Sequence, residues 1–302
     1  RFKEAGFDPS VSQRVRNLIT FYARIRNYPR HLGQHSGGMI ISLGRLDGVV
    51  PIEPATMENR RIIQWDKDDC AEMGIVKVDL LGLGMMAAIR DTLTIIESSR
   101  GETVDLAKIP KDDPLVYQTL RDADTVGMFQ VESRAQMNFL PKARPETFYD
   151  LVVQVAIIRP GPIVGNMLSG YLKRRQGLEP VDYMHPSLQP VLERTLGIPL
   201  FQEQVLKIGM EVAGLTGGEA EELRRALGFK RADKKLKAIE EKMRRGMTNN
   251  GIDQETQQKI VAAVNAFANY GFPESHAASF ALLTYASAYL KVHYLDAFVT
   301  AM

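Results

Sequence analysis

The hydrophobic periodicity of this chain changes once, near residue 84, and this change limits the folds that the chain can adopt. Before it, short segments show the two-residue alternation of β-strands. After it, apolar residues recur at the spacing of amphipathic helices. We therefore predict an α+β fold that is mainly α, with a small β segment followed by a large helical region. The predicted strands lie at about residues 39–43, 49–52, 60–65 and 75–81.

Local signals predict where the helices begin and end. A helix over residues 11–27 precedes the β segment, and a helical turn starts at Asp66. In the second part, Thr216 and Glu219 form a capping-box pattern, and Asp253 suits an N-cap position. The predicted helices of this part cover about residues 85–98, 114–121, 132–140, 146–157, 200–213, 217–228, 254–270 and 277–294.

The length, the cysteine count and the apolar runs of the chain exclude some classes of protein. The length of 302 residues fits about two domains. The single cysteine, Cys70, excludes intramolecular disulfides and cysteine-cluster metal sites, and it agrees with a reducing cytoplasm, where we expect the protein. No apolar run approaches the roughly 20 residues of a membrane span. Because the chain starts at Arg1 in a polar segment and stops at Met302 on a helical pattern, we interpret it as a piece of a longer protein.

The last predicted strand carries two charged residues on one face. Successive side chains of a strand point to opposite faces, so Val76, Val78 and Leu80 share one face. Lys77 and Asp79 share the other. The segment by itself is compatible with an edge strand that has a solvated face, and equally with a functional site.

Two histidines precede the first predicted strand. His31 and His35 are followed by Gly37 and Gly38, and glycines at such a place let the backbone approach another segment or a ligand closely. No third metal ligand lies near the histidines in the sequence. We therefore favour a turn with hydrogen-bonding side chains over a metal site.

Several cations lie at turns and helix ends of the second part. Arg159 precedes a Pro-Gly-Pro turn, and Arg224 and Arg225 lie in the last turns of a helix. Lys230 and Arg231 open a strongly basic segment, whose excess positive charge favours a polyanionic partner. The alternatives are an exposed arginine at a structural turn, and cations that complement a helix dipole.

Ser275 and His276 come just before the last long helix. The N-terminus of a helix offers free N–H groups, so a phosphate could bind there. Without further context, an N-cap serine beside a partly buried histidine is the favoured interpretation.

Six motifs occur together in the order found in one family. The motifs are Ile75–Leu83 (IVKVDLLGL), Gly127–Ser133 (GMFQVES), Arg159–Pro162 (RPGP), Phe201–Gln204 (FQEQ), Leu223–Ala226 (LRRA) and Tyr270–Ala278 (YGFPESHAA). With these motifs the chain resembles the bacterial C-family DNA polymerases, the α subunit of DNA polymerase III, and some details resemble the error-prone branch of that family.

This resemblance implies a template-directed DNA polymerase that works by two-metal nucleotidyl transfer, in error-prone translesion replication or DNA repair. Residues 1–30 would end the thumb, residues 31–84 would form the C-terminal part of a nucleotidyltransferase-like palm, and residues 85–302 would belong to the fingers. The implied partners are template–primer DNA and deoxynucleoside triphosphates. A sliding clamp or accessory repair proteins would bind through regions outside this chain.

The resemblance also implies residue roles. Asp79 matches the third of three aspartates that bind two Mg²⁺ ions, and the other two would lie before Arg1, so this chain alone is expected to be inactive. Lys77 would supply a positive charge near the transferring phosphoryl group. A non-catalytic helical nucleic-acid-binding module remains the alternative, because the basic segment over residues 224–245 supports it equally well. The residues implied to contact nucleotide or DNA are Arg159, Arg224, Arg225, Lys230, Arg231, Ser275 and His276.

Overall fold

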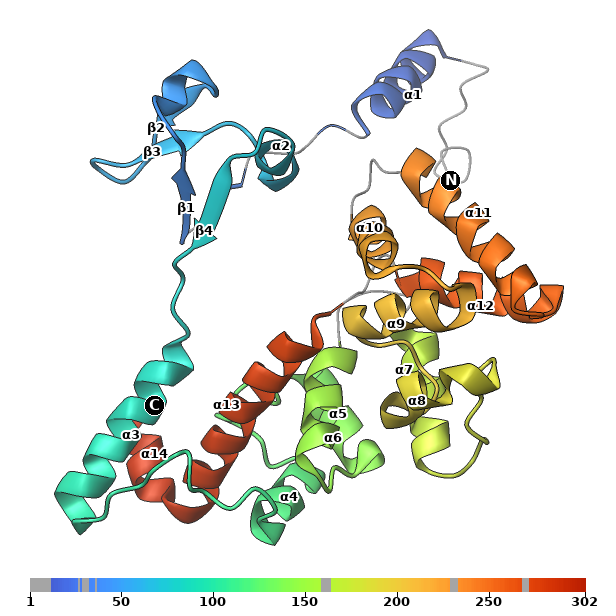
Figure 1. Cartoon of the computed structure of the whole chain (residues 1–302). Coiled ribbons are helices and arrows are strands. Elements are labelled where there is room, and N and C mark those ends of the chain that lie inside the picture. The colour runs from blue at the N-terminus through green and yellow to red at the C-terminus, as the bar shows by residue number, and fades with distance from the viewer. Residues whose placement is uncertain are drawn as a thin grey trace. The chain divides into compact units, whose positions relative to one another are not determined.

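The chain forms two compact units, Arg1–Gly82 and Leu83–Met302. Helices predominate, and the named strands of the described residues all belong to the first unit, so the predicted α+β, mainly α fold is confirmed. The division between the units lies close to the predicted change of periodicity near residue 84. The computed structural model describes residues 12–26, 28, 33–35, 37–158, 164–228, 233–267 and 272–302 (Figure 1).

The first unit contains two small antiparallel sheets. Strand β1 pairs with β4, and β2 pairs with β3. In the first of these sheets, Gly38 lies directly opposite Asp79 and Ile40 lies opposite Lys77. The elements of this unit are α1 (Gln13–Ile25), β1 (Gly38–Ile41), the 3-10 helix η1 (Leu46–Gly48), β2 (Ile52–Pro54), β3 (Arg61–Ile63), α2 (Lys67–Glu72) and β4 (Val76–Asp79).

The strand predicted over residues 49–52 is wrong in position, because β2 begins at Ile52. The N–H groups of Val49 and Val50 both donate to the carbonyl oxygen of Leu46, at 3.0 Å. These bonds close a 3-10 turn, so this backbone does not pair with a strand. Val50 is nevertheless buried, which explains why its segment has the hydrophobicity of a strand.

The helical turn predicted from Asp66 is confirmed as α2. An Asp66 side-chain oxygen accepts the backbone N–H groups of Asp68 and Asp69, both at 2.9 Å, which caps the helix. Val50 and Cys70 are the only buried apolar residues among the described part of this unit. The side chains of β4 are therefore accessible to solvent.

The second unit is a set of packed helices. Its predicted helices are confirmed, with ends that shift by up to three residues. Its elements are α3 (Gly84–Arg100), α4 (Pro114–Arg121), α5 (Arg134–Ala143), α6 (Phe148–Ile157), α7 (Val164–Arg175), η2 (Pro186–Leu188), α8 (Gln189–Leu192), η3 (Glu193–Thr195), α9 (Gln202–Ala213), α10 (Gly217–Gly228), α11 (Asp233–Asn249), α12 (Gln254–Phe267), α13 (Glu274–His293) and α14 (Leu295–Ala301).

Helix α13 runs through the middle of this unit, against α6 on one side and against α3 and α14 on the other (Figure 1). Its face toward the core carries small residues, and Ala277, Ala281 and Ala288 are fully buried. Small side chains let α6 approach closely. Helix α6 is correspondingly buried over all seven residues of 151–157. This packing holds the first turn of α13 in place.

A second core forms among α9, α10, α11 and α12. It contains Val205 and Val212 of α9, Leu223 of α10, and Met243 and Met247 of α11, all nearly or fully buried. Because Leu223 is an anchor of α10, the residues that follow it are held against α9. This core therefore positions the arginine pair described below.

Of the three N-caps that the sequence predicts, two are confirmed and one is wrong. The capping box is present, since Thr216 N–H donates to Glu219 at 2.9 Å, and Asp253 accepts the N–H of Thr256 at 3.0 Å. Helix α13, however, starts at Glu274 with Pro273 as its N-cap, so Ser275 is not the N-cap residue. Pro273 has an extended backbone (ψ 128°), and the chain turns helical immediately after it.

Among the described residues, no helix combines the length and the apolar character needed to cross a membrane.

Candidate functional site

Asp79 ends strand β4 with its carboxylate largely open to solvent. Its side chain is 57% exposed. One oxygen, Oδ1, accepts the backbone N–H of Leu81 at 3.0 Å, and Oδ2 lies 3.2 Å from Nε2 of His35. An ionised carboxylate has about four lone-pair sites, so each oxygen keeps room for another partner.

Lys77 and Asp79 lie on one face of the sheet, as the alternation predicts. The surroundings of Gly38, which lies opposite Asp79 in the β1–β4 register, show this. A Cβ atom added to Gly38 would lie 3.0 Å from Cε of Lys77 and 3.1 Å from Nδ1 of His35. The lysine stem and the histidine ring therefore meet over this glycine, next to the carboxylate.

The chemistry of this face fits one part of a magnesium site. Mg²⁺ prefers oxygen ligands, usually one or two carboxylates, and Asp79 offers an open carboxylate. No group of three or more His, Cys, Asp or Glu side chains that could hold a metal occurs among the described residues. Strands β1 and β4 thus offer one carboxylate here, that of Asp79.

The sequence predicted the turn at His35 but not its contact with Asp79. The predicted turn with a hydrogen-bonding side chain is present, because the N–H of Gly37 donates to Nδ1 of His35 at 3.1 Å. The contact between His35 and Asp79 could not be foreseen, since 44 residues separate them in the sequence. His31 lies outside the described residues.

The second unit presents a pair of arginines near the end of α10. Arg224 donates through Nε and Nη2 to the carboxylate of Glu221, at 2.8 and 2.6 Å, and through Nη1 to Gln202 at 3.3 Å. Nε of Arg225 donates to the same carboxylate at 3.0 Å. Hydrogen bonds from Arg224 and then from Arg225 lower the pKa of Glu221 to about 2, so this carboxylate is ionised at neutral pH.

Both arginines retain donors for a ligand. A guanidinium has five N–H donors, and the hydrogen bonds of Arg224 to Glu221 and Gln202 use three of them. Arg225 is the more exposed of the two, at 69% of its side chain. A guanidinium edge suits bidentate binding of phosphate oxygens.

The start of α13 lies beside this arginine pair. Gln202, which accepts from Arg224, is followed by Glu203, and Glu203 accepts the backbone N–H of Glu274 at 2.9 Å. Backbone pairing between Phe201 and Phe272 joins the same two segments. The structure thus links Arg224 of α10, through the first residues of α9, to the start of α13, which lies 50 residues later in the sequence.

Glu274, the first residue of α13, contacts Tyr149 and Arg194, which also contact each other. The Tyr149 hydroxyl donates to Oε1 of Glu274 at 2.7 Å, and the Arg194 guanidinium lies 3.4 Å above the Tyr149 ring. Arg194 also pairs with Glu274 at 3.6 Å. Burial and the neighbouring Glu274 raise the pKa of Tyr149, so it stays a protonated donor.

Ser275 and His276 are both exposed, so the expected partly buried histidine is wrong. His276 lies away from the buried alanine face of α13, and its ring packs between Phe272 and Phe280, with centroids 4.9 and 4.1 Å away. An exposed polar pair at the first turn of a long helix is accessible to a ligand. Of the other predicted contact residues, Arg159, Lys230 and Arg231 lie outside the described residues.

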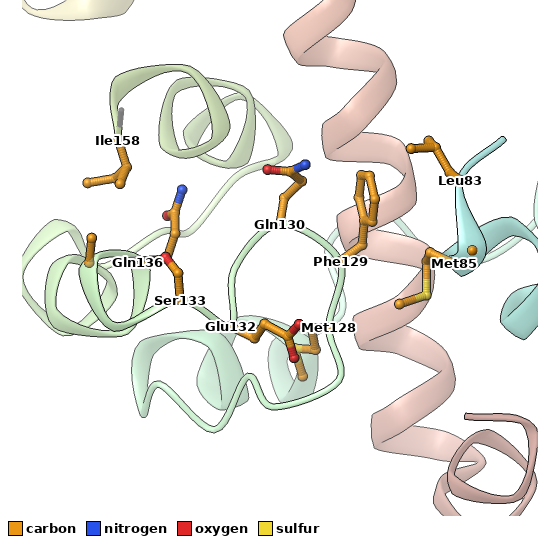
Figure 2. Close-up of a pocket in the computed structure, with 11 residues that line it drawn as sticks. Leu83, Met85, Met128, Phe129, Gln130, Glu132, Ser133, Gln136 and Ile158 are labelled. Carbon is orange, nitrogen blue, oxygen red and sulfur yellow. Dashed lines mark hydrogen bonds between the residues drawn. The ribbon is translucent and has the colours of Figure 1, made fainter. Parts of the chain in front are cut away.

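The motif Gly127–Ser133 forms a wall of a pocket of about 660 Å³ in the second unit (Figure 2). Its loop is tied at three points: Thr125 to Val131 at 2.6 Å, Gly127 to Glu132 at 3.0 Å, and Phe129 to Ser287 of α13 at 3.0 Å. The sequence predicted no site at this motif. Figure 2 shows the side chains of Phe129, Gln130, Gln136 and Ile158 around the pocket.

The basic helix α11 is partly neutralised by its own carboxylates. Glu240 pairs with Arg244 and Glu241 pairs with Arg245 at i, i+4 spacing, with N–O distances of 2.9 and 3.6 Å. Lys242 pairs with Glu219, the capping-box residue of α10. These contacts leave less free positive charge on α11 than its composition suggests.

An open carboxylate can bind a divalent cation, and an exposed guanidinium can bind phosphate oxygens. Residues 85–251, more than half of the chain, match the model of the bacterial DNA polymerase III alpha subunit finger domain. Residues 4–82 match the model of the bacterial DNA polymerase III alpha NTPase domain. The chain therefore belongs to the bacterial DNA polymerase III α-subunit family, as the resemblance predicted.

Curated relatives match the chain from end to end. It is 50% identical over 302 residues to the error-prone DNA polymerase of Pseudomonas fluorescens, covering 100% of this chain and 29% of that protein. It is 49% identical to the error-prone DNA polymerase of Dechloromonas aromatica, with the same coverage. It is 47% identical over 300 residues to error-prone DNA polymerase 2 of Agrobacterium fabrum, covering 99% of this chain and 28% of that protein. The chain thus spans under a third of the length of these relatives.

Proposed function

We propose that this chain is a core part of a template-directed DNA polymerase of the error-prone branch, which acts in translesion replication or DNA repair. The observation that carries the proposal is the identity of about half of all residues with proteins named error-prone DNA polymerase. The open carboxylate of Asp79 and the arginine pair of α10 support it, because polymerisation needs a metal ligand and cations for a triphosphate.

The first unit supplies residues of the metal site. Asp79 holds one Mg²⁺ ion together with aspartates that are expected before Arg1. When bound, two such ions stabilise the entering and leaving oxygens of the displacement at phosphorus. Lys77, on the same face as Asp79, adds a fixed positive charge that favours the negatively charged phosphoryl group in the transition state.

The second unit supplies residues that bind the nucleotide or the template–primer. Arg224 and Arg225 bind phosphate oxygens through the donors that Glu221 leaves available. Ser275 and His276, at the nearby start of α13, line the same part of the nucleotide site. Arg159, Lys230 and Arg231 are proposed DNA or nucleotide contacts on the sequence alone.

The division into subdomains follows the same proposal. Residues 1–30 end the thumb, 31–84 complete the palm, and 85–302 belong to the fingers. The boundary between the two compact units, at Gly82 and Leu83, supports the second of these limits. We further propose a cytoplasmic location, and clamp or accessory repair proteins that bind outside this chain.

Primer extension tests this function against a helical module that only binds nucleic acid. The intact protein is incubated with a primed template, the four deoxynucleoside triphosphates and Mg²⁺. We expect extension that depends on the template and on Mg²⁺. Binding of the primed template without any extension would favour the binding module, for which the basic segment of α10 and α11 is the supporting feature.

Changing Arg224 and Arg225 together to alanine is expected to raise the nucleotide KM about tenfold or more, or to lower kcat. A hydrogen bond to a charged group contributes about 1.5–3 kcal/mol, so loss of one such bond alone corresponds to roughly this factor. Steady-state primer extension by the intact protein measures both constants.

The matched control is the double change of Arg244 and Arg245 to alanine on α11. It removes the same charge from a neighbouring pair that also contacts glutamates. We expect an unchanged nucleotide KM. If both double variants weaken DNA binding equally and neither changes the nucleotide KM or kcat, the nucleotide-binding role of α10 is contradicted.

A further inference from the structure

His35 contacts the proposed metal ligand of the first unit, although no role is assigned to it. We propose that His35 is a positioning residue, whose ring N–H holds the Asp79 carboxylate in the orientation that binds the divalent cation. This inference rests on the proposed function of Asp79 as a metal ligand. Its support is the contact of 3.2 Å between Nε2 and Oδ2 of Asp79.

The backbone determines which ring nitrogen of His35 carries the proton. The N–H of Gly37 donates to Nδ1 at 3.1 Å, so Nδ1 must be an acceptor without a hydrogen. A neutral imidazole then has its hydrogen on Nε2, the nitrogen that faces Asp79. Nε2 therefore carries its hydrogen 3.2 Å from the carboxylate and has no lone pair for a metal ion. His35 acts through Asp79 and is not itself a ligand.

The two oxygens of the carboxylate have different neighbours. Leu81 N–H donates to Oδ1 at 3.0 Å, and Nε2 of His35 lies 3.2 Å from Oδ2. With the proposed contact from His35, both oxygens are held and the plane of the carboxylate is fixed, while each oxygen keeps a lone pair for a cation. Hydrogen-bond partners of metal ligands act in this way, and their loss typically weakens metal binding by 10–100-fold.

The two glycines after His35 make this contact possible. A Cβ on Gly37 would lie 2.7 Å from Cβ of Leu81 and 2.9 Å from its backbone nitrogen, which no real side chain tolerates. A Cβ on Gly38 would lie 3.1 Å from the His35 ring. Side chains at either position would push the end of β4 away from the histidine. The close approach is thus built into β1 and β4.

Mn²⁺ binding to the intact protein tests the proposal, with electron paramagnetic resonance of free Mn²⁺ as the readout. The Mn²⁺ site to be measured is the one that the wild type has and the Asp79→Asn variant lacks. We expect His35→Ala to raise the Kd of that site by about 10–100-fold. His35→Gln, whose amide N–H can reach the position of Nε2, is expected to restore most of the affinity. The KM for Mg²⁺ in primer extension should rise in parallel, with kcat recovered at high Mg²⁺.

His185→Ala is the matched control. Nδ1 of His185 also accepts a backbone N–H two residues later, from Ser187 at 3.3 Å, far from any proposed metal ligand in the sequence. We expect it to leave Mn²⁺ binding unchanged. Wild-type affinity in His35→Ala, or no recovery in His35→Gln while the variant stays folded, would overturn the positioning role. Wild-type Mn²⁺ binding in Asp79→Asn would instead overturn the assignment of Asp79 as a ligand.

Discussion

Replacing Asp79 by alanine is expected to lower primer extension by the intact protein about 10³-fold or more. A catalytic metal ion supplies several kcal/mol of transition-state stabilisation, and each 1.36 kcal/mol corresponds to tenfold in rate. Asp79 is the single carboxylate that the described part of this chain offers on the β1–β4 face. Single-turnover extension at saturating nucleotide measures the rate.

Asp79→Asn separates the charge of the residue from its shape. The amide keeps the size of the side chain, but it has a single acceptor oxygen in place of two, and it is a poor ligand for Mg²⁺. We expect a loss of rate close to that of the alanine variant, with primer–template affinity nearly unchanged. Extension at the wild-type rate by either variant would show that Asp79 is not a metal ligand.

Asp47 provides the matched control in the same unit. Its carboxylate is about half exposed and pairs with Arg45. Asp47→Ala therefore removes an equally accessible charge that lies outside the proposed site. We expect extension within about twofold of wild type, because exposed ion pairs contribute little to stability.

Changing Gly246 to alanine is expected to destabilise the helical unit by about 3 kcal/mol. Gly246 lies on α11 where this helix crosses the end of α9. An added Cβ would overlap the carbonyl oxygen of Ala213 and would lie 2.7 Å from its carbonyl carbon. Both atoms belong to the backbone, so neither can move aside as a flexible side chain would. Met243 and Met247, which flank the glycine on the same helix, are buried.

Gly170→Ala is the matched control, on helix α7. A Cβ there meets only Cδ1 of Ile198 at 3.9 Å, an ordinary contact. Alanine has a higher helix propensity than glycine by about 1 kcal/mol, so we expect unchanged or slightly increased stability. Urea unfolding of the intact protein, with helical circular dichroism as the signal, measures both variants. Equal stability of Gly246→Ala and wild type would contradict the close crossing of α9 and α11.

Local pattern predicted most of the helical structure, because the signals that start and stop a helix lie within a few residues. The capping box of Thr216 and Glu219 is one example, since both residues belong to one turn. Helix α4 begins at Pro114 and ends at Arg121, as predicted. The start of α13 was missed because a proline N-cap lacks the usual serine or aspartate signal.

The segment over residues 49–52 shows where local pattern misleads. Its hydrophobicity predicted a strand, and Val50 is indeed buried, but the backbone closes a turn on Leu46. Periodicity reports which side chains are buried, and it does not report which hydrogen-bond partner the backbone finds. Short apolar runs are therefore ambiguous.

The sequence alone determined the two-part architecture, the family, and the face shared by Lys77 and Asp79. Each of these depends on order or spacing along the chain, which the sequence states directly. Only the tertiary structure decided which residues contact these side chains. The antiparallel pairing of β1 with β4 brings His35 to Asp79, and contacts of α9 with α10 and with Glu274 link Arg224 to the start of α13. These contacts join residues that are far apart in the sequence, so their distances depend on how the strands and helices pack.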